Sequence, residues 1–349
     1  MKVATEVLEL AFRDPFRIAR GPRDEVARTV VGIVTAEDGG TGIGEGFPDA
    51  FYGETPATVS AVVPLLVDAV AALGAMPDDL VDVRRWLIDA AAAMDERLSH
   101  NGAAKCLVDI ALHDLAGKRL GLALPELLGT PRALPPTDYT IGIDEPAVVA
   151  ERARRAAKFP ALKIKLGGES DLETLRAVRD VYDGALRVDA NTGWTPEIAD
   201  ELLPVCVELG VELIEQPFGA RRLDQLGWLQ GRSSLPIVAD ESAVVAADLD
   251  GLVGVVAGVN VKLAKVGGVG PALRMIVRAR ELGFRIFLGC MEETSLGIAA
   301  SAAVAGLVDW VDLDGNLLLI DDPFTGLELD DACRWQLPEA PGVGVRRVA

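Results

Sequence analysis

The chain has 349 residues, half of them hydrophobic and a quarter charged, and its formal net charge is −19. This length and composition predict a globular protein with one large domain or two ordinary ones. The acidic balance disfavours nucleic acid and anionic membranes as partners.

The four cysteines lack CxxC spacing, and the N-terminus lacks a basic segment followed by an apolar core. These features are typical of reduced thiols and do not predict a signal peptide. The most apolar segment, residues 59–76, contains Pro64 and Asp68, so it predicts a core helix rather than a membrane span. We therefore expect a cytoplasmic location.

Residues 1–125 predict an α+β domain. Residues 16–35 and 41–48 have the pattern of antiparallel strands, and residues 55–75, 77–92 and 101–119 have that of helices. The motif "GIGEG" has no strand–helix crossover after it, so it does not predict a dinucleotide site. The irregular C-terminal tail, about residues 318–349, is expected to complete this domain.

Residues 126–317 predict an α/β barrel, because short apolar runs alternate with helical patterns eight times. The expected strands are residues 137–143, 161–167, 185–191, 211–217, 236–242, 258–265, 285–291 and 310–315. The clearest expected helices are residues 145–159, 172–182, 196–210, 270–283 and 295–306. The weakest helical pattern is the one that precedes residue 258.

Charged residues recur near the ends of these apolar runs. Lys165, Asp189, Glu215, Asp240 and Lys265 follow one another at intervals of 24, 26, 25 and 25 residues. One βα unit has about this length, so the five side chains are expected around the C-terminal mouth of the barrel, where barrel enzymes hold their catalytic residues.

The three acids of this series predict a metal site. Asp189, Glu215 and Asp240 would repel one another unless a cation lay between them. Carboxylate oxygens without histidine or cysteine suit Mg²⁺, with Mn²⁺ as a further possibility. The competing interpretation is that each acid caps a helix or pairs with a lysine.

The lysines predict acid–base chemistry. Lys163 and Lys165, in "KIK", lie on one face of a strand. A neighbouring ammonium or a divalent ion lowers the pKa of a lysine and makes it a better base. Lys265 is expected to face Lys165 across the metal. Lys262 is three residues earlier in the same run, so it is expected to point the other way, in a supporting or structural role.

The ordered motifs "KIK", "DANTGW", "IEQP", "ADES" and "KLAKVGG" resemble those of the enolase superfamily, within its muconate-lactonizing branch. The resemblance extends over essentially the whole chain. It implies a (β/α)₇β TIM-like barrel with an N-terminal capping domain. It further implies Mg²⁺ on the three acids, Lys165 and Lys265 as the acid–base pair, and Lys163 in support.

Within that branch, "VDLDG" resembles the DxD feature of dipeptide epimerases of the L-Ala-D/L-Glu type. The resemblance implies that Asp312 and Asp314 hold the substrate ammonium, although "DG" is also a turn signal. The segment "FRIARGPR" resembles a specificity loop whose arginine binds a glutamate side chain, which suggests Arg20 or Arg23.

Two further residues are expected near the substrate. Thr140 ends the first barrel strand and is expected to contact the substrate backbone. Glu292 stands where related epimerases tend to carry an aliphatic residue. The sequence leaves open whether this carboxylate favours a cationic or polar dipeptide or points into solvent.

The expected function is Mg²⁺-dependent epimerisation of a dipeptide by 1,1-proton transfer at the α-carbon of its C-terminal residue. The alternatives on the same scaffold are an N-acylamino acid racemase and a β-elimination of the cycloisomerase or o-succinylbenzoate synthase type. A Schiff-base aldolase and a barrel that only binds a ligand are more distant alternatives. A homo-oligomer is also expected.

Overall fold

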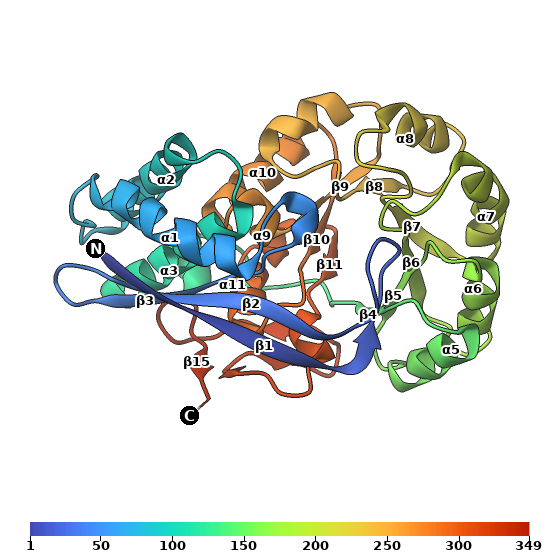
Figure 1. The fold of residues 1–349 in the computed structure, drawn as a ribbon, viewed down its shortest axis with the longest axis horizontal. Helices are drawn as coiled ribbons and strands as arrows, with labels where there is room; N and C mark the ends of the chain where they lie inside the picture. The colour runs from blue at the N-terminus through green and yellow to red at the C-terminus, as the bar shows by residue number, and fades with distance from the viewer. Residues whose placement is uncertain (349) are drawn as a thin grey trace.

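A three-stranded antiparallel sheet and an eight-stranded parallel sheet organise the chain in a computed structural model, which describes residues 1–348 (Figure 1). The smaller sheet contains β1 (Lys2–Phe16), β2 (Asp24–Thr35) and β3 (Thr41–Gly46). The helices that accompany it are η1 (Ala50–Tyr52), α1 (Pro56–Ala71), α2 (Leu80–Arg97), α3 (Gly102–Leu120) and α4 (Leu124–Leu128). Together these elements form the capping domain that the sequence predicts, although most of β1 was not expected.

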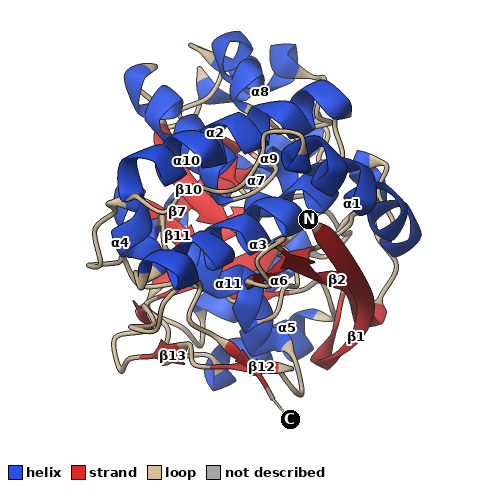
Figure 2. Cartoon of the chain, turned by 90° about the vertical axis from the view of Figure 1, so that its left-hand side faces the viewer, coloured by secondary structure: helices blue, strands red, loops and turns tan. Residues whose placement is uncertain are grey.

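Three alternate glycines of β3 let helix α3 lie unusually close to the capping sheet (Figure 2). A Cβ on Gly42 or Gly44 would lie 1.9 Å from the carbonyl oxygen of Ala111 or Leu107, respectively. A Cβ on Gly46 would lie 2.1 Å from the carbonyl oxygen of Ala103. Residues two apart on β3 therefore lie against residues four apart on α3. The "GIGEG" motif thus serves packing.

Gly44→Ala should lower the free energy of unfolding by about 3 kcal/mol, because the added methyl group would force helix and sheet apart. Urea unfolding of the purified variant measures this change. The matched control is Gly251→Ala, since a Cβ there meets nothing within 4 Å. An unchanged unfolding midpoint for Gly44→Ala would contradict the proposed role of the glycines.

The parallel sheet closes into a barrel. Its strands are β4 (Tyr139–Ile141), β5 (Ala161–Lys165), β6 (Ala185–Asp189), β7 (Val211–Glu215), β8 (Ile237–Ala239), β9 (Gly258–Val261), β10 (Arg285–Gly289) and β11 (Trp310–Asp312). Neighbours in the chain are neighbours in the sheet, and a parallel bridge between Thr137 and Val311 joins its two edges. The barrel fold predicted from the sequence is confirmed.

Helices connect the strands around the outside of the barrel (Figure 1). They are α5 (Pro146–Arg155), α6 (Asp171–Arg179), α7 (Pro196–Glu208), α8 (Leu223–Gln230), α9 (Leu263–Val266), α10 (Val269–Glu281) and α11 (Ser295–Ala302). Shorter 3₁₀ segments are η2 (Ala246–Leu252), η3 (Ala305–Leu307) and η4 (Gly315–Leu318). The weak helical pattern before β9 corresponds to η2, a 3₁₀ segment rather than an α-helix.

The C-terminal tail contacts the capping domain and also the barrel, where the indole of Trp335 donates to the carbonyl of Leu313 at 2.8 Å. It contains two short strand pairs, β12 (Phe324–Thr325) with β15 (Arg346–Arg347) and β13 (Glu328–Leu329) with β14 (Trp335–Gln336). The amide of Ile320 donates to the carbonyl of Ala11 on β1 at 2.8 Å. This contact agrees with a tail that completes the capping domain, while the boundaries at residues 125 and 317 stay a prediction.

Helix α3 also fastens the capping domain to the barrel. The carboxylate of Asp109 accepts hydrogen bonds from the amides of Val269 and Gly270, at the start of α10. His113, one turn later, is buried in the same contact. This contact fixes the segment that follows β9. Within residues 1–348, no helix combines the length and the apolar character that crossing a membrane requires.

Candidate active site

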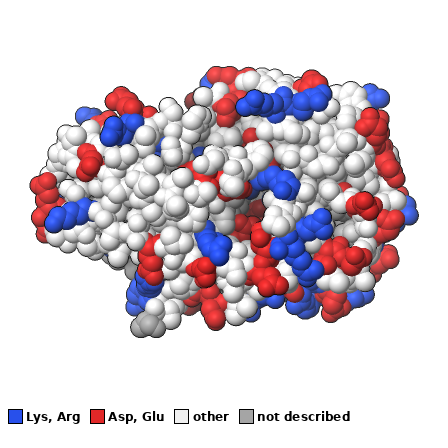
Figure 3. Space-filling model, in the orientation of Figure 1, with Lys and Arg blue, Asp and Glu red and all other residues white. Residues whose placement is uncertain are grey.

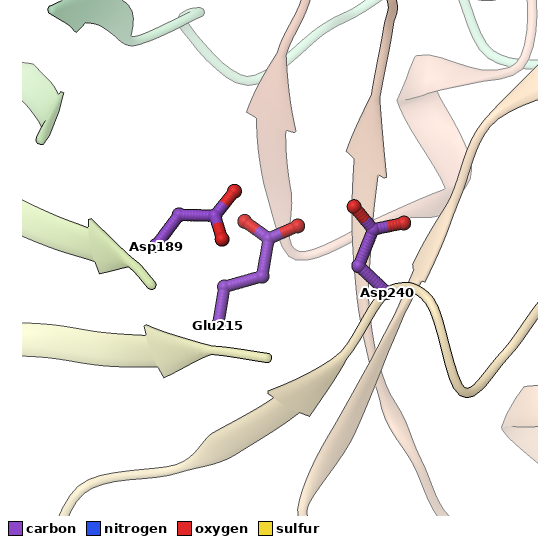
Figure 4. Close-up of side chains that lie close together, drawn as sticks. All are labelled: Asp189, Glu215 and Asp240. Carbon is purple, nitrogen blue, oxygen red and sulfur yellow. The ribbon is translucent and has the colours of Figure 1, made fainter. Parts of the chain in front are cut away.

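Three buried carboxylates meet at the C-terminal mouth of the barrel. Asp189 and Glu215 are the last residues of β6 and β7, and Asp240 directly follows β8. One oxygen from each lies within 4.8 Å of the others (Figure 4). Burial and the charge of Asp189 raise the pKa of Glu215 to about 7. The three acids thus have the donor type and spacing that a divalent cation requires.

The "KIK" lysines lie beside this trio, on one face of β5 as predicted. Lys165 Nζ is 2.7 Å from Asp189 Oδ2. Lys163 Nζ lies deeper, 2.7 Å from Glu215 Oε2 and 2.6 Å from Asp312 Oδ2. Although burial favours its neutral form, the charges of these carboxylates raise the pKa of Lys163 well above its ordinary value. Lys163 is therefore placed to hold the acids in position, and Lys165 lies at the outer edge of the trio.

Lys262 and Lys265 do not point in opposite directions, so that prediction was wrong. Strand β9 ends at Val261, and the chain turns into α9, which brings both ammonium groups to Asp240. Lys262 Nζ is 2.9 Å from Asp240 Oδ2. Although burial opposes it, the charge of Asp240 raises the pKa of Lys262. A cation bound to Asp240 would counteract this increase.

Lys265 is enclosed by hydrogen-bond acceptors. Its Nζ donates to the carboxylate of Asp240 and to the carbonyl oxygens of Asp240, Ala243 and Asn260, the carbonyls at 2.8 to 3.0 Å. An ammonium has only three hydrogens, so these four acceptors leave none for a substrate. Lys262, by contrast, ion-pairs only with Asp240 among residues 1–348.

Asp312, the last residue of β11, and Asp314, two residues later, both contact Thr140. Asp312 Oδ1 accepts from the Thr140 hydroxyl at 3.0 Å, and Asp314 Oδ2 accepts from its amide. Burial and the charge of Asp312 raise the pKa of Asp314 to about 7. For Asp312, burial acts in the same direction, but the charge of Lys163 outweighs it and lowers the pKa. Among residues 1–348, Asp314 is therefore the acid of this pair that has no lysine or arginine partner.

Arg20 and Arg23 both have acidic partners within the protein. Arg20 ion-pairs with Glu241, lies 3.4 Å from Asp49 and stacks its guanidinium on the ring of Phe51. Arg23 Nη2 is 3.3 Å from Asp144 Oδ2. The structure thus brings both arginines to the mouth of the barrel, but pairs each of them with a carboxylate.

A cavity of about 630 Å³ opens beside Lys165. Its charged lining comprises three basic side chains, Arg17, Arg23 and Lys165, and four acidic ones, Asp144, Glu145, Glu169 and Asp171. Both kinds of charge border a hollow on the face of the molecule in Figure 3. The β1–β2 turn forms one wall, since the amide of Ile143 donates to the carbonyl of Arg17 at 2.9 Å. Arg17 was not predicted from the sequence.

Two buried amides were also missed. Asn260 Nδ2 donates to Glu215 Oε1 at 2.5 Å, and Asn191 Nδ2 lies 3.3 Å from Asp189 Oδ2. Both orient metal-site carboxylates. The signal was available, because Asn191 belongs to "DANTGW" and Asn260 to the apolar run that carries Lys262.

Comparisons with known proteins identify the family of this chain. The pattern described as "Enolase C-terminal domain-like" matches residues 147–347, and that of the "Mandelate racemase / muconate lactonizing enzyme, N-terminal domain" matches residues 2–129. An L-Ala-D/L-Glu epimerase from Bacteroides thetaiotaomicron is 36% identical over 351 residues, which cover 100% of this chain and 88% of the relative.

Two solved structures are similar over the whole chain. A dipeptide epimerase from Enterococcus faecalis, complexed with Mg and L-Leu-L-Tyr, is 33% identical with a TM-score of 0.89, covering 99% of both chains. A dipeptide epimerase from Methylococcus capsulatus, complexed with Mg and L-Arg-D-Lys, is 32% identical with a TM-score of 0.86, covering 99% of this chain and 98% of the other. The chain therefore belongs to the mandelate racemase / muconate lactonizing enzyme family of the enolase superfamily.

Proposed function

We propose that this protein is a Mg²⁺-dependent dipeptide epimerase that inverts the α-carbon of the C-terminal residue. The observation that carries the proposal is the position of two lysines at opposite ends of the carboxylate trio. Lys165 contacts Asp189 at one end, and Lys262 contacts Asp240 at the other. A substrate α-carbon above the trio would thus have an amine on each face.

The acid–base pair in this proposal is Lys165 and Lys262. The geometry favours Lys262 over Lys265, the residue expected from the sequence, because the hydrogens of Lys265 are fully used. One lysine removes the α-proton, and the other returns a proton to the opposite face. Lys265 holds Asp240 and the backbone around it.

Asp189, Glu215 and Asp240 would hold the Mg²⁺ ion, which would stabilise the negative charge that develops on the substrate carboxylate. Lys163 and Asn260 keep Glu215 oriented. At the other end of the substrate, Asp312 and Asp314 are placed to bind the ammonium, and Thr140 holds both acids in position.

The β-elimination and N-acylamino acid alternatives use substrates without a free ammonium. Asp312 is paired with Lys163, but Asp314 has no lysine or arginine partner among residues 1–348 and would stay so with such a substrate, although burial of an unpaired charge is costly. The presence of Asp312 and Asp314 therefore favours a dipeptide. A homo-oligomeric state and a cytoplasmic location stay predictions.

With Mg²⁺ in deuterium oxide, the protein should exchange the α-proton of the second residue of an L,L-dipeptide and then produce the epimer. One-dimensional proton NMR of Ala-Glu, Leu-Ala and Lys-Ala measures both events. EDTA should stop exchange, and added Mg²⁺ should restore it, because the carboxylate trio cannot stabilise negative charge without a cation. Exchange of N-succinylamino acids but of no dipeptide would contradict the proposal.

A further inference from the structure

The loop that carries Glu292, residues 290–294, joins β10 to α11 and is anchored at its end from the capping domain. The carboxylate of Glu45 on β3 accepts from the Thr294 hydroxyl at 2.6 Å, the Thr294 amide at 3.1 Å and the Gly297 amide at 2.9 Å. The amide of Ser295 donates to Asp322 at 3.0 Å. The position of Glu292 is therefore set by bonds from two other parts of the chain.

The same loop packs against the segment that follows β11. Strands β10 and β11 are paired, with Gly289 opposite Asp312. A Cβ on Gly315 would lie 2.3 Å from the carbonyl oxygen of Met291, so the two segments are in close contact. Glu292 therefore lies on the side of the mouth where Asp312 and Asp314 bind the ammonium in the proposed function.

Glu292 is partly buried, and its own backbone amide donates to its carboxylate, yet no lysine or arginine among residues 1–348 forms an ion pair with it. Burial raises its pKa, and the charges of Lys165 and Lys262 oppose this increase. Those two lysines belong to the reacting centre. A partly buried carboxylate without a partner is a receptor for a cation.

The charges at this end of the site can be compared with those of a dipeptide. Asp312 is paired with Lys163, whereas Asp314 and Glu292 have no lysine or arginine partner within the described residues. The α-ammonium of an ordinary dipeptide would match one of these two acids. A second cation is needed for the other, and the nearest part of the substrate is the side chain of its first residue.

We infer that the substrate is a dipeptide whose N-terminal residue has a basic side chain, and that Glu292 binds that side chain. This inference rests on the proposed function, because it uses the ammonium site at Asp312 and Asp314 to orient the dipeptide. The charges of Arg20 and Arg23 do not argue against a basic substrate side chain, since both arginines are paired with acids of the protein.

The test compares two substrates of equal carbon chain, Lys-Ala and norleucyl-Ala. The value of kcat/KM for Lys-Ala should be about tenfold to a hundredfold higher, the effect of one charge-assisted hydrogen bond. Glu292→Gln should remove this preference by lowering kcat/KM for Lys-Ala alone. The matched control is Glu201→Gln, on the exposed face of α7, which should leave the ratio unchanged.

Equal rates for the two substrates, or a preference that survives in Glu292→Gln, would overturn the inference. A Glu292-dependent preference for Ala-Lys over Ala-norleucine, without one at the first position, would also overturn it, because the carboxylate would then serve the second residue. In each of these cases some dipeptide is epimerised, so the proposed function stands. If no dipeptide exchanges its α-proton, the proposed function itself fails.

Discussion

Lys165→Ala and Lys262→Ala should each lower the rate of epimerisation by about 10²- to 10⁴-fold, the usual contribution of one general acid or base. Inversion needs both amines, because the proton leaves from one face and returns to the other. Each variant should still exchange the α-proton of one diastereomer, the one whose hydrogen faces the remaining lysine. The two variants should retain opposite diastereomers.

Proton NMR in deuterium oxide, with the L,L- and L,D-forms supplied separately, measures this split. Titration calorimetry with Mg²⁺ is the control, since both variants should still bind the ion through Asp189, Glu215 and Asp240. Loss of exchange with both diastereomers in one variant would indicate that a single lysine serves both faces. Full activity of Lys262→Ala would return the second catalytic role to Lys265.

The barrel was predictable from the sequence because its repeat is regular. Apolar runs recur at the length of one βα unit, and a parallel strand buried on both faces has little reason to end in a charge. The acids Asp189, Glu215 and Asp240 therefore stood out, and the structure places them together. The ends of successive parallel strands lie at the same edge of the sheet. Predicting that these three acids lie together therefore needs no knowledge of long-range contacts.

The second lysine was harder to identify, because the rule used for it assumes a strand throughout. Side chains three apart point to opposite faces of a strand, yet β9 ends at Val261 and α9 begins at Leu263. The change to helical geometry turns Lys265 back toward Asp240, beside Lys262. Gly267 and Gly268, at the end of "KLAKVGG", are turn signals, but the sequence does not show where the strand ends.

The partners of the loop arginines were also beyond the sequence. Arg20 pairs with Glu241, which is 221 positions away in the chain, and Arg23 pairs with Asp144. Each pair depends on how the β1–β2 turn rests on the barrel, and no local pattern encodes that contact. An arginine that the sequence suggests for substrate binding can thus form an ion pair within the protein instead.

Lys265→Met should lower the free energy of unfolding by about 3–5 kcal/mol, the cost of breaking a buried ion pair by removing one partner. Lys265 is 4% exposed, and its ammonium donates to three carbonyl oxygens besides the carboxylate of Asp240. Methionine fills a similar volume but donates no hydrogen bond, so these acceptors would stay buried without a donor.

Urea unfolding in the presence of EDTA measures this cost without a contribution from bound cation. Lys2→Met is the matched control, because Lys2 is exposed and its loss should change stability by less than about 0.5 kcal/mol. A Lys265→Met variant as stable as the parent, but unable to exchange one diastereomer, would make Lys265 a base. Loss of stability with exchange retained at both faces would instead establish that this lysine supports Asp240, whose oxygens the metal needs in a fixed position.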